Sequence, residues 1–110
     1  MFEVPKSGIF KSMAWSVILT NSTIKNIRKL PENIRARLHF LVQEIRQMGP
    51  IRANRLNYGK IRGVEDCYHC HLKKGNPTYI AVWKVVDKES KTVEVKYAGT
   101  HEKADYNRIC

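Results

Sequence analysis

Three β-rich segments follow one another closely in the second half of the chain, and they constrain the fold more than any other feature. They cover residues 67–73, 79–86 and 92–98, and the turn signals KGNP (74–77) and DKES (87–90) separate them. These connections are too short to hold a crossover helix, so neighbouring strands must run antiparallel. We therefore expect an antiparallel meander near the C-terminus.

The first half of the chain predicts one strand followed by a helical hairpin. Residues 14–20 (AWSVILT) are rich in β-forming residues. Asn21 or Ser22 is suited to cap a short helix. A second helix is expected to begin near Pro31 and to stop at Gly49-Pro50. The apolar positions that keep a 3.6-residue period through both helices are Ile24, Ile27, Leu30, Ile34, Leu38, Leu41, Val42, Ile45 and Met48. The expected fold is α+β, with the element order β-α-α-β-β-β.

Length and composition favour one folded unit in a reducing compartment. A chain of 110 residues with 43% hydrophobic residues is able to bury a single core, and we expect a loose N-terminal arm (1–13) and one domain (14–110). No apolar run reaches the roughly 20 residues that span a bilayer, and no small-residue cleavage site follows the apolar run near the N-terminus. The chain has only three cysteines, an odd number that does not fit the disulfide framework of a secreted domain. We expect a cytoplasmic protein with no membrane association.

The charge of the chain predicts a polyanionic partner. Lys and Arg number 20 against 10 Asp and Glu, which gives a formal net charge of +10. Residues 1–64 hold twelve of the basic and three of the acidic residues, so the first half is the stronger electrostatic surface. Nucleic acid, the ribosome, an anionic membrane and an acidic protein all remain possible from charge alone.

The stretch CYHCH (67–71) has the Cys-x-x-Cys-His form of a c-type haem attachment site. Side chains alternate between the two faces of a strand, so Cys67 and Cys70 are expected to point in opposite directions. The same alternation disfavours a zinc site, and we expect neither haem nor any other cofactor. One face should carry Cys67, His69, His71 and Lys73, and the other Tyr68, Cys70 and Leu72. The first face is polar and cationic, and periodicity alone is equally consistent with a solvated surface that has no function.

Four sequence blocks resemble the RelE branch of the RelE/ParE toxin superfamily. They are PIRANRL (50–56), IRGVEDCYHCHLK (61–73), YIAVW (79–83) and GTHEKADY (99–106). The resemblance runs from about Trp15 to Tyr106 and includes the predicted element order. It implies two helices packed on an antiparallel sheet. It also implies a toxin that cleaves mRNA in the ribosomal A site without a metal and is held inactive by a cognate antitoxin.

The resemblance further implies which residues form the active site. A family arginine that precedes a Gly-x-x-Asp-Cys-Tyr segment matches Arg62, and a basic residue after a late glycine matches His101. Lysines that alternate along the following strand fall on His69, His71 and Lys73. The candidate catalytic residues are His69, His71, His101 and Tyr106, and the candidate RNA-binding residues are Arg62, Lys73, Lys74 and Lys60. The histidine-rich face is more similar to the YafQ-type relatives.

Imidazoles in place of lysines are chemically sensible for metal-free RNA cleavage. Cleavage needs a base for the ribose 2′-OH, cations for the phosphorane and an acid for the 5′-oxygen, and histidine titrates near neutral pH. Our hypothesis assigns His71 or His69 as the base and His101 as the acid. Lys73 with Arg62 would hold the phosphate. Tyr106 would stack on a base or align the 2′-OH.

Two other functions stay open at this stage. One is a ParE-like toxin that binds a protein target such as gyrase without catalysis. The other is a nucleic-acid-binding protein with a decayed active site, because Ile80 stands where the family has a phosphate-contacting arginine. The candidates also have structural interpretations, since His101 could simply end a strand and Tyr106 could cover the core.

The remaining cations and aromatic residues have simpler assignments. A set of basic residues on the outer face of the predicted helices suits docking on ribosomal RNA, in a manner that salt should weaken: Arg28, Lys29, Arg35, Arg37 and Arg46. Trp15, Trp83 and Tyr79 are assigned to core packing.

Overall fold

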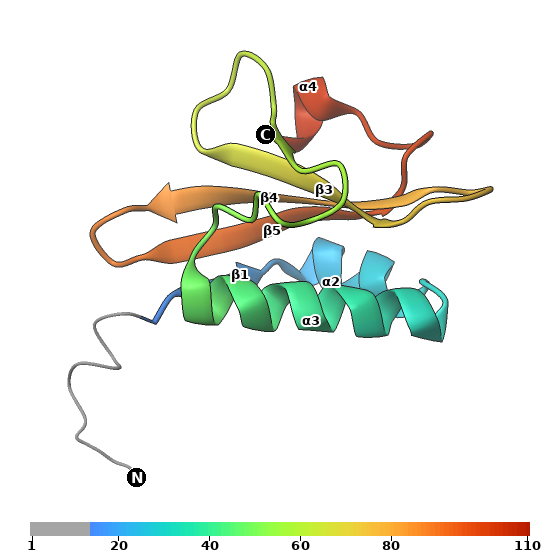
Figure 1. Cartoon of the computed structure of the whole chain (residues 1–110), viewed down its shortest axis with the longest axis horizontal. Coiled ribbons are helices and arrows are strands. Elements are labelled where there is room, and N and C mark those ends of the chain that lie inside the picture. Colours follow the sequence, from blue (N-terminus) through green and yellow to red (C-terminus); the bar gives the residue numbers. More distant parts are fainter. Residues whose placement is uncertain (1–13) are drawn as a thin grey trace, which may run out of the picture.

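A computed structural model describes residues 14–110 and shows one five-stranded sheet with helices on both of its faces (Figure 1). The helices α2 (Asn21–Arg28) and α3 (Glu32–Met48) cover one face, and the short α4 (Tyr106–Ile109) lies on the opposite face. The arm expected over residues 1–13 lies outside the described residues. Within 14–110, no helix is long and apolar enough to cross a membrane.

The sheet contains the predicted meander and two additions. The strands β3 (Cys67–Lys73), β4 (Tyr79–Asp87) and β5 (Thr92–Thr100) pair antiparallel, as expected. β1 (Ser16–Leu19) pairs parallel with β5, and β2 (Gly59–Lys60) pairs with β3, which gives the order β1-β5-β4-β3-β2. The sequence predicted neither β2 nor α4, because elements of two and four residues carry no measurable periodicity.

The helical hairpin forms where the sequence predicts it, with one different cap. Thr20, rather than Asn21 or Ser22, caps α2: its Oγ1 accepts a hydrogen bond from the Thr23 amide at 3.3 Å. α3 follows Pro31 and ends at Gly49, whose φ of +96° is strained for any residue with a Cβ.

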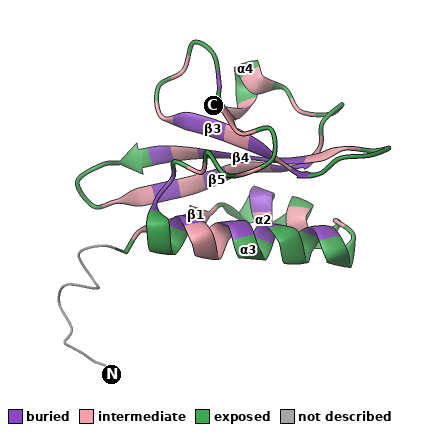
Figure 2. Cartoon of the chain, in the orientation of Figure 1, coloured by how far each residue is buried: buried purple, intermediate pink, exposed green. Residues whose placement is uncertain are grey.

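The main core lies between the two long helices and the sheet (Figure 2). Ile34, Leu38, Leu41 and Ile45 of α3 are buried, and each contributes roughly 1.5–3 kcal/mol by leaving water. Trp83 is fully buried beneath them and donates its indole N–H to the Pro50 carbonyl at 3.0 Å. The core assignments of Trp15, Trp83 and Tyr79 are confirmed. Met48 keeps the apolar period of α3 but is not in the core, because it is 66% exposed at the last turn of the helix.

A second, smaller core lies on the other face of the sheet, beneath α4. It contains Ile61, Cys67, Ile80 and Val82, and the partly buried Tyr106, Ile109 and Cys110 pack against it. Cys67 is fully buried and forms a disulfide with Cys110. This disulfide departs from the expectation of a reducing compartment, in which disulfides are rare. The prediction of a wholly polar face was therefore wrong at Cys67, whereas the burial of Tyr68, Cys70 and Leu72 on the helix side is confirmed. Apolar residues of β4 and the C-terminal segment, which are distant in sequence, create this second core.

The segment between α3 and β2 is held against both layers. Arg55 donates to both carboxylate oxygens of Glu44 at 3.2 Å, and Arg52 donates to one of them at 3.1 Å. Burial opposes ionisation of Glu44, but the hydrogen bonds from the two guanidinium groups outweigh it and lower the pKa of this carboxyl. The His71 amide donates to the Leu56 carbonyl at 2.8 Å. These contacts fix the position from which β2 begins.

Candidate functional site

Strand β3 presents His69 and His71 on the face of the sheet that also carries α4. Their cross-strand partners on β4 are Val82 and Ile80, both members of the second core. The two imidazoles are half-buried, whereas the core residues beside them are fully buried. Alternation along β3 therefore places both histidines where the sequence predicts them.

Four aromatic side chains from three segments form a continuous row, which we call the histidine row: His69, Tyr106, His101 and His71. Tyr106 of α4 lies 5.8 Å from the His69 ring and 6.4 Å from the His101 ring, measured between centroids. The His101 and His71 rings lie 6.1 Å apart. The structure thus brings together all four candidate catalytic residues, although up to 37 positions separate them in sequence.

The C-terminal segment reaches the histidine row through defined local contacts. The His101 amide donates to the Thr78 carbonyl at 2.8 Å, which anchors the turn after β5. Asp105 then caps α4 by accepting a hydrogen bond from the Asn107 amide at 3.2 Å. Tyr106 is the first residue of this helix, so the cap and the Cys67–Cys110 disulfide hold its ring over β3.

A groove of about 510 Å³ opens beside His69 and Tyr106. Its lining residues come from β2, the loop after it, β3 and α4: Lys60, Ile61, Arg62, Gly63, Val64, His69, Tyr106 and Asn107. None of them is acidic, and both Lys60 and Arg62 are exposed to solvent. The groove therefore joins two candidate catalytic residues to two candidate RNA-binding residues in one cationic surface.

The backbone of β2 sets the position of the His69 ring. Gly59 is the cross-strand partner of His69, and a Cβ on residue 59 would lie 3.1 Å from His69 Nε2. Since that distance is shorter than ordinary van der Waals contact, a residue with a Cβ at position 59 would require the His69 ring to shift. This role of Gly59 could not be predicted from the sequence, because β2 itself was not predicted.

Both histidines of β3 have lowered pKa values. For His69 the main cause is burial, followed by the nearby charges of His71 and His101. For His71 the causes are burial, then His101 and Lys74. The Nδ1 atoms of both rings are shielded from solvent, and no hydrogen-bond partner for them lies within the described residues. Protonation there would bury a charged donor without an acceptor, so both rings favour the neutral form at pH 7.

Tyr106 is suited to donate a hydrogen bond rather than to act as a base. Burial, and secondarily Tyr97, raises the pKa of its phenol above the ordinary value of 10.0. The hydroxyl therefore keeps its proton at neutral pH. Its ring lies between the imidazoles of His69 and His101 and packs against the second core.

The two lysines at the end of β3 lie in different surroundings. A bulge between His71 and Lys73 sets Lys73 opposite Tyr79, whose ring packs against the main core. Cross-strand partners share a face, so Lys73 does not continue the histidine face as strict alternation predicted. Lys74 is exposed in the next turn, and its charge contributes to the lowered pKa of His71.

The cysteines of the CYHCH stretch lie on opposite faces of the sheet, as alternation predicts. Cys67 belongs to the second core and Cys70 to the main core, where burial raises the pKa of the Cys70 thiol to about 11. Within residues 14–110, no three side chains of the His, Cys, Asp and Glu types gather closely enough to hold a metal ion.

Comparison with solved structures gives several similar chains. A double arginine-to-alanine mutant of E. coli toxin RelE in the free state is 29% identical, with a TM-score of 0.66 over 86% of this chain and 92% of that one. The toxin in the intact E. coli RelBE toxin-antitoxin complex is 30% identical, with a TM-score of 0.60 over 84% and 99%. The archaeal RelE-RelB complex from Pyrococcus horikoshii OT3 contains a chain of the same fold at 18% identity, with a TM-score of 0.60 over 84% and 100%. A scan against protein-family models found no match, and a search of curated proteins found none either.

Proposed function

This chain belongs to the RelE family of toxins, and from that membership we propose that it is a ribosome-dependent endoribonuclease that cleaves mRNA in the A site. The observation that carries the proposal is the histidine row, which sets three imidazoles and a phenol side by side at the edge of a cationic groove. A protein that only bound a target would not need titratable groups in that arrangement.

In the proposed reaction, one histidine of β3 accepts the proton of a ribose 2′-OH. The 2′-oxygen then attacks the adjacent phosphorus, and the bond from phosphorus to the 5′-oxygen breaks. The departing 5′-oxygen takes a proton from His101, which leaves a 2′,3′-cyclic phosphate and a 5′-hydroxyl. His71 or His69 serves as the base, because a lowered pKa keeps each of them unprotonated near neutral pH.

The spacing between His71 and His101 supports this division of roles. An acid and a base must each come within about 2.6–3.2 Å of a different oxygen of the same phosphate. Two rings with centroids 6.1 Å apart are close enough to reach opposite sides of one phosphate group. His69 lies farther along the row, so His71 is the better base when His101 is the acid.

Cations around the row would stabilise the phosphorane. Lys60 and Arg62 line the groove, and Lys74 acts on His71 electrostatically. We assign the phosphate role that Ile80 cannot perform to Lys74 beside His71, and contacts to the rest of the RNA strand near His69 to Lys60 and Arg62. Lys73 is retained as an RNA contact outside the row, and Tyr106 stacks on a base or donates to the 2′-oxygen.

We also propose a cognate antitoxin as partner and the cytoplasm as the site of action. Similar toxins are found in complex with an antitoxin in the E. coli RelBE structure. A surplus of ten positive charges favours both an acidic protein partner and the ribosome. The predicted outer cations of the helical layer are exposed to solvent: Arg28, Lys29, Arg35, Arg37 and Arg46. Arg28 and Arg46 are the best suited to ribosomal RNA, because Arg35 and Arg37 already donate to backbone carbonyls.

The test is A-site cleavage on ribosomes stalled with a defined codon, with the mRNA ends mapped by primer extension and a ribosome-free control. His71→Ala and His101→Ala should each slow cleavage by about 10²-fold or more, as expected for loss of a general base or acid. His39→Ala is the matched control, because His39 is exposed on α3 and lies outside the row. Toxicity that survives both site substitutions would instead support a non-enzymatic toxin.

A further inference from the structure

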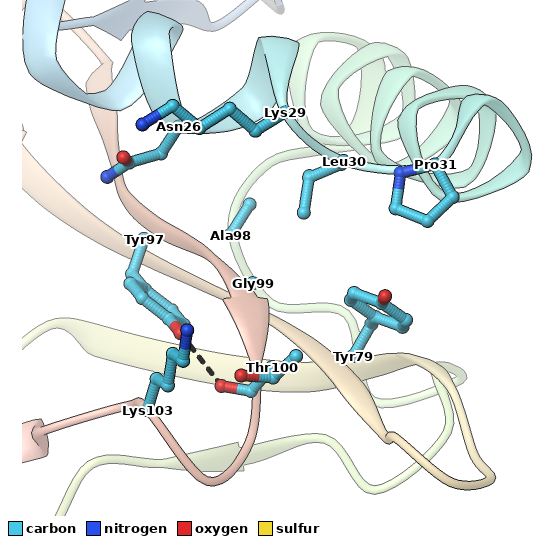
Figure 3. Close-up of a pocket in the computed structure, with 10 residues that line it drawn as sticks. All are labelled: Asn26, Lys29, Leu30, Pro31, Tyr79, Tyr97, Ala98, Gly99, Thr100 and Lys103. Carbon is cyan, nitrogen blue, oxygen red and sulfur yellow. Dashed lines mark hydrogen bonds between the residues drawn. The ribbon is translucent and has the colours of Figure 1, made fainter.

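A second pocket lies at the edge of the sheet next to His101, and it is separate from the groove at His69. Its volume is about 320 Å³, and it lies between the C-terminal end of α2 and the ends of β4 and β5 (Figure 3). The residues used below are Asn26, Lys29, Tyr97, Gly99, Thr100 and Lys103. We call it the Lys29–Lys103 pocket.

The pocket exists because β1 is shorter than β5. The pairing of the two strands ends at Leu19 opposite Val95, whereas β5 continues to Thr100. Beyond Val95 the end of α2, rather than a strand, lies beside β5 (Figure 3). A recess therefore remains between the helical layer and the last residues of β5.

The pocket is electrostatically suited to a phosphate. Lys29 enters it from the helical layer and Lys103 from the segment after β5, and no acidic residue lines it (Figure 3). The carbonyls at the end of α2 disfavour an anion, but four of them already accept hydrogen bonds, which reduces this repulsion. Those of Asn26 and Ile27 accept backbone hydrogen bonds, and those of Arg28 and Leu30 accept from Arg35.

Tyr97 provides a fixed aromatic surface in the same pocket. Its hydroxyl donates to the Thr100 carbonyl at 2.8 Å, so the polar end of the ring is already engaged (Figure 3). A Cβ on Gly99 would lie 2.7 Å from that hydroxyl oxygen and 2.9 Å from the ring carbon beside it. The ring is thus held against the glycine backbone, and a pre-ordered ring loses little entropy when a base stacks on it.

The pocket adjoins the proposed cleavage site along the chain, because Thr100 lines it and His101 is the next residue. Consecutive Cα atoms are only about 3.8 Å apart. Lys103 lies two residues further on. An RNA strand with its scissile phosphate between His71 and His101 would therefore reach the pocket with a neighbouring nucleotide.

We propose that the Lys29–Lys103 pocket binds one nucleotide of the RNA substrate beside the cleaved position. Lys29 and Lys103 contact its phosphates, Tyr97 stacks on its base, and the Asn26 amide is available to a base edge. The assignment to RNA rests on the proposed endoribonuclease function, but the binding site has its own test.

The test uses adenosine 3′,5′-bisphosphate as the probe and the full chain, labelled for NMR. Saturable shifts are expected at the Gly99 and Thr100 amides, with adenosine and inorganic phosphate each binding more weakly. Lys29→Ala and Lys103→Ala should each lower the affinity for the bisphosphate by about tenfold, which corresponds to the loss of one charged hydrogen bond. For binding to single-stranded RNA, each should also reduce the magnitude of the slope of log K against log salt concentration by about 0.7.

The matched control is Lys25→Ala, an exposed lysine of α2 outside the pocket, which should leave the affinity unchanged. The proposal is overturned if the two pocket variants bind as tightly as the parent, or if the shifts map only to the groove at Lys60 and Arg62. Because the probe is not cleaved, the result is independent of catalysis. If the bisphosphate binds but A-site mRNA stays intact, the pocket proposal is supported and the endoribonuclease proposal is refuted. If the mRNA is cleaved but the bisphosphate does not bind, the endoribonuclease proposal is supported and the pocket proposal is refuted.

Discussion

His69 lies opposite Gly59 in the β2–β3 pair, with its Nε2 atom 3.1 Å from where a Cβ on residue 59 would stand. Gly59→Ala should therefore displace the imidazole from its place beside Tyr106. We expect A-site cleavage to fall by about tenfold, because misplacing a site group by a fraction of an ångström already costs rate. The measurement is the single-turnover cleavage rate on stalled ribosomes.

A double-mutant cycle separates this effect from general damage to β2. In a His69→Ala background, Gly59→Ala should have no further effect, since the ring that it displaces is gone. Equal losses in both backgrounds would show that Gly59 acts through the backbone and not through His69. The amide shifts of the main core report whether each variant is folded.

The lowered pKa values of His69 and His71 predict a pH-dependent stability. In the folded state both titrate below their ordinary value of 6.5, so the unfolded chain binds more protons as the pH falls through 6.5. The free energy of unfolding should thus rise with pH across that window and level off above it. Urea titrations at several pH values between about 5 and 8 measure the slope.

Removal of either histidine should flatten the slope, and His69→Gln and His71→Gln are the variants to compare. Glu44, whose pKa lies below its ordinary value of 4.5, affects the free energy of unfolding only at more acidic pH, so it does not interfere with this measurement. Lys25→Ala serves as the unchanged reference on the surface of α2. A slope that persists after both histidine substitutions would assign the pH dependence to other groups.

Most of the fold follows from local sequence. Alternation and short turns predict β3, β4 and β5, and the 3.6-residue period with Gly49-Pro50 predicts the end of α3. The missing elements, β2 and α4, are stabilised by contacts from outside themselves. Gly59–Lys60 pairs with β3, and α4 rests on the second core and the Cys67–Cys110 disulfide. No periodicity within two or four residues encodes such contacts.

The candidate site was predictable where strand geometry governs it. Alternation gives the common face of His69 and His71, but it fails at Lys73, where the bulge changes the register. The approach of Tyr106 to two imidazoles depends on the path of the chain after β5. A resemblance to a family supplied that proximity as an expectation, whereas residue spacing alone did not.

The disulfide between Cys67 and Cys110 holds the wall of the groove that α4 provides. Cys110→Ser should release the C-terminal segment and lower stability by about 3–4 kcal/mol, as expected for a cross-link that closes a loop of this length. It should also weaken RNA binding, since Tyr106 and Asn107 line the groove. Urea unfolding with and without a thiol reductant gives the stability change.

The reductant supplies the internal control for this prediction. Stability of the parent chain should fall in reductant to the level of the Cys110→Ser variant, and the variant itself should not respond. A parent chain that is indifferent to reductant would mean that packing of Ile109 and Tyr106 alone retains α4.

Ile80 is fully buried in the second core with Val82, beneath α4. It occupies the position at which the family has a phosphate-contacting arginine. Ile80→Arg should therefore fail to restore a catalytic cation. It would bury an unpaired charge at a cost of several kcal/mol, which is a large share of the stability of a domain this size. Ile80→Val, the volume control, should cost only about 0.5–1.5 kcal/mol. Urea unfolding and A-site cleavage measure both effects. An Ile80→Arg protein that is as stable as its parent and cleaves faster would place position 80 at the RNA surface and refute its role in the core.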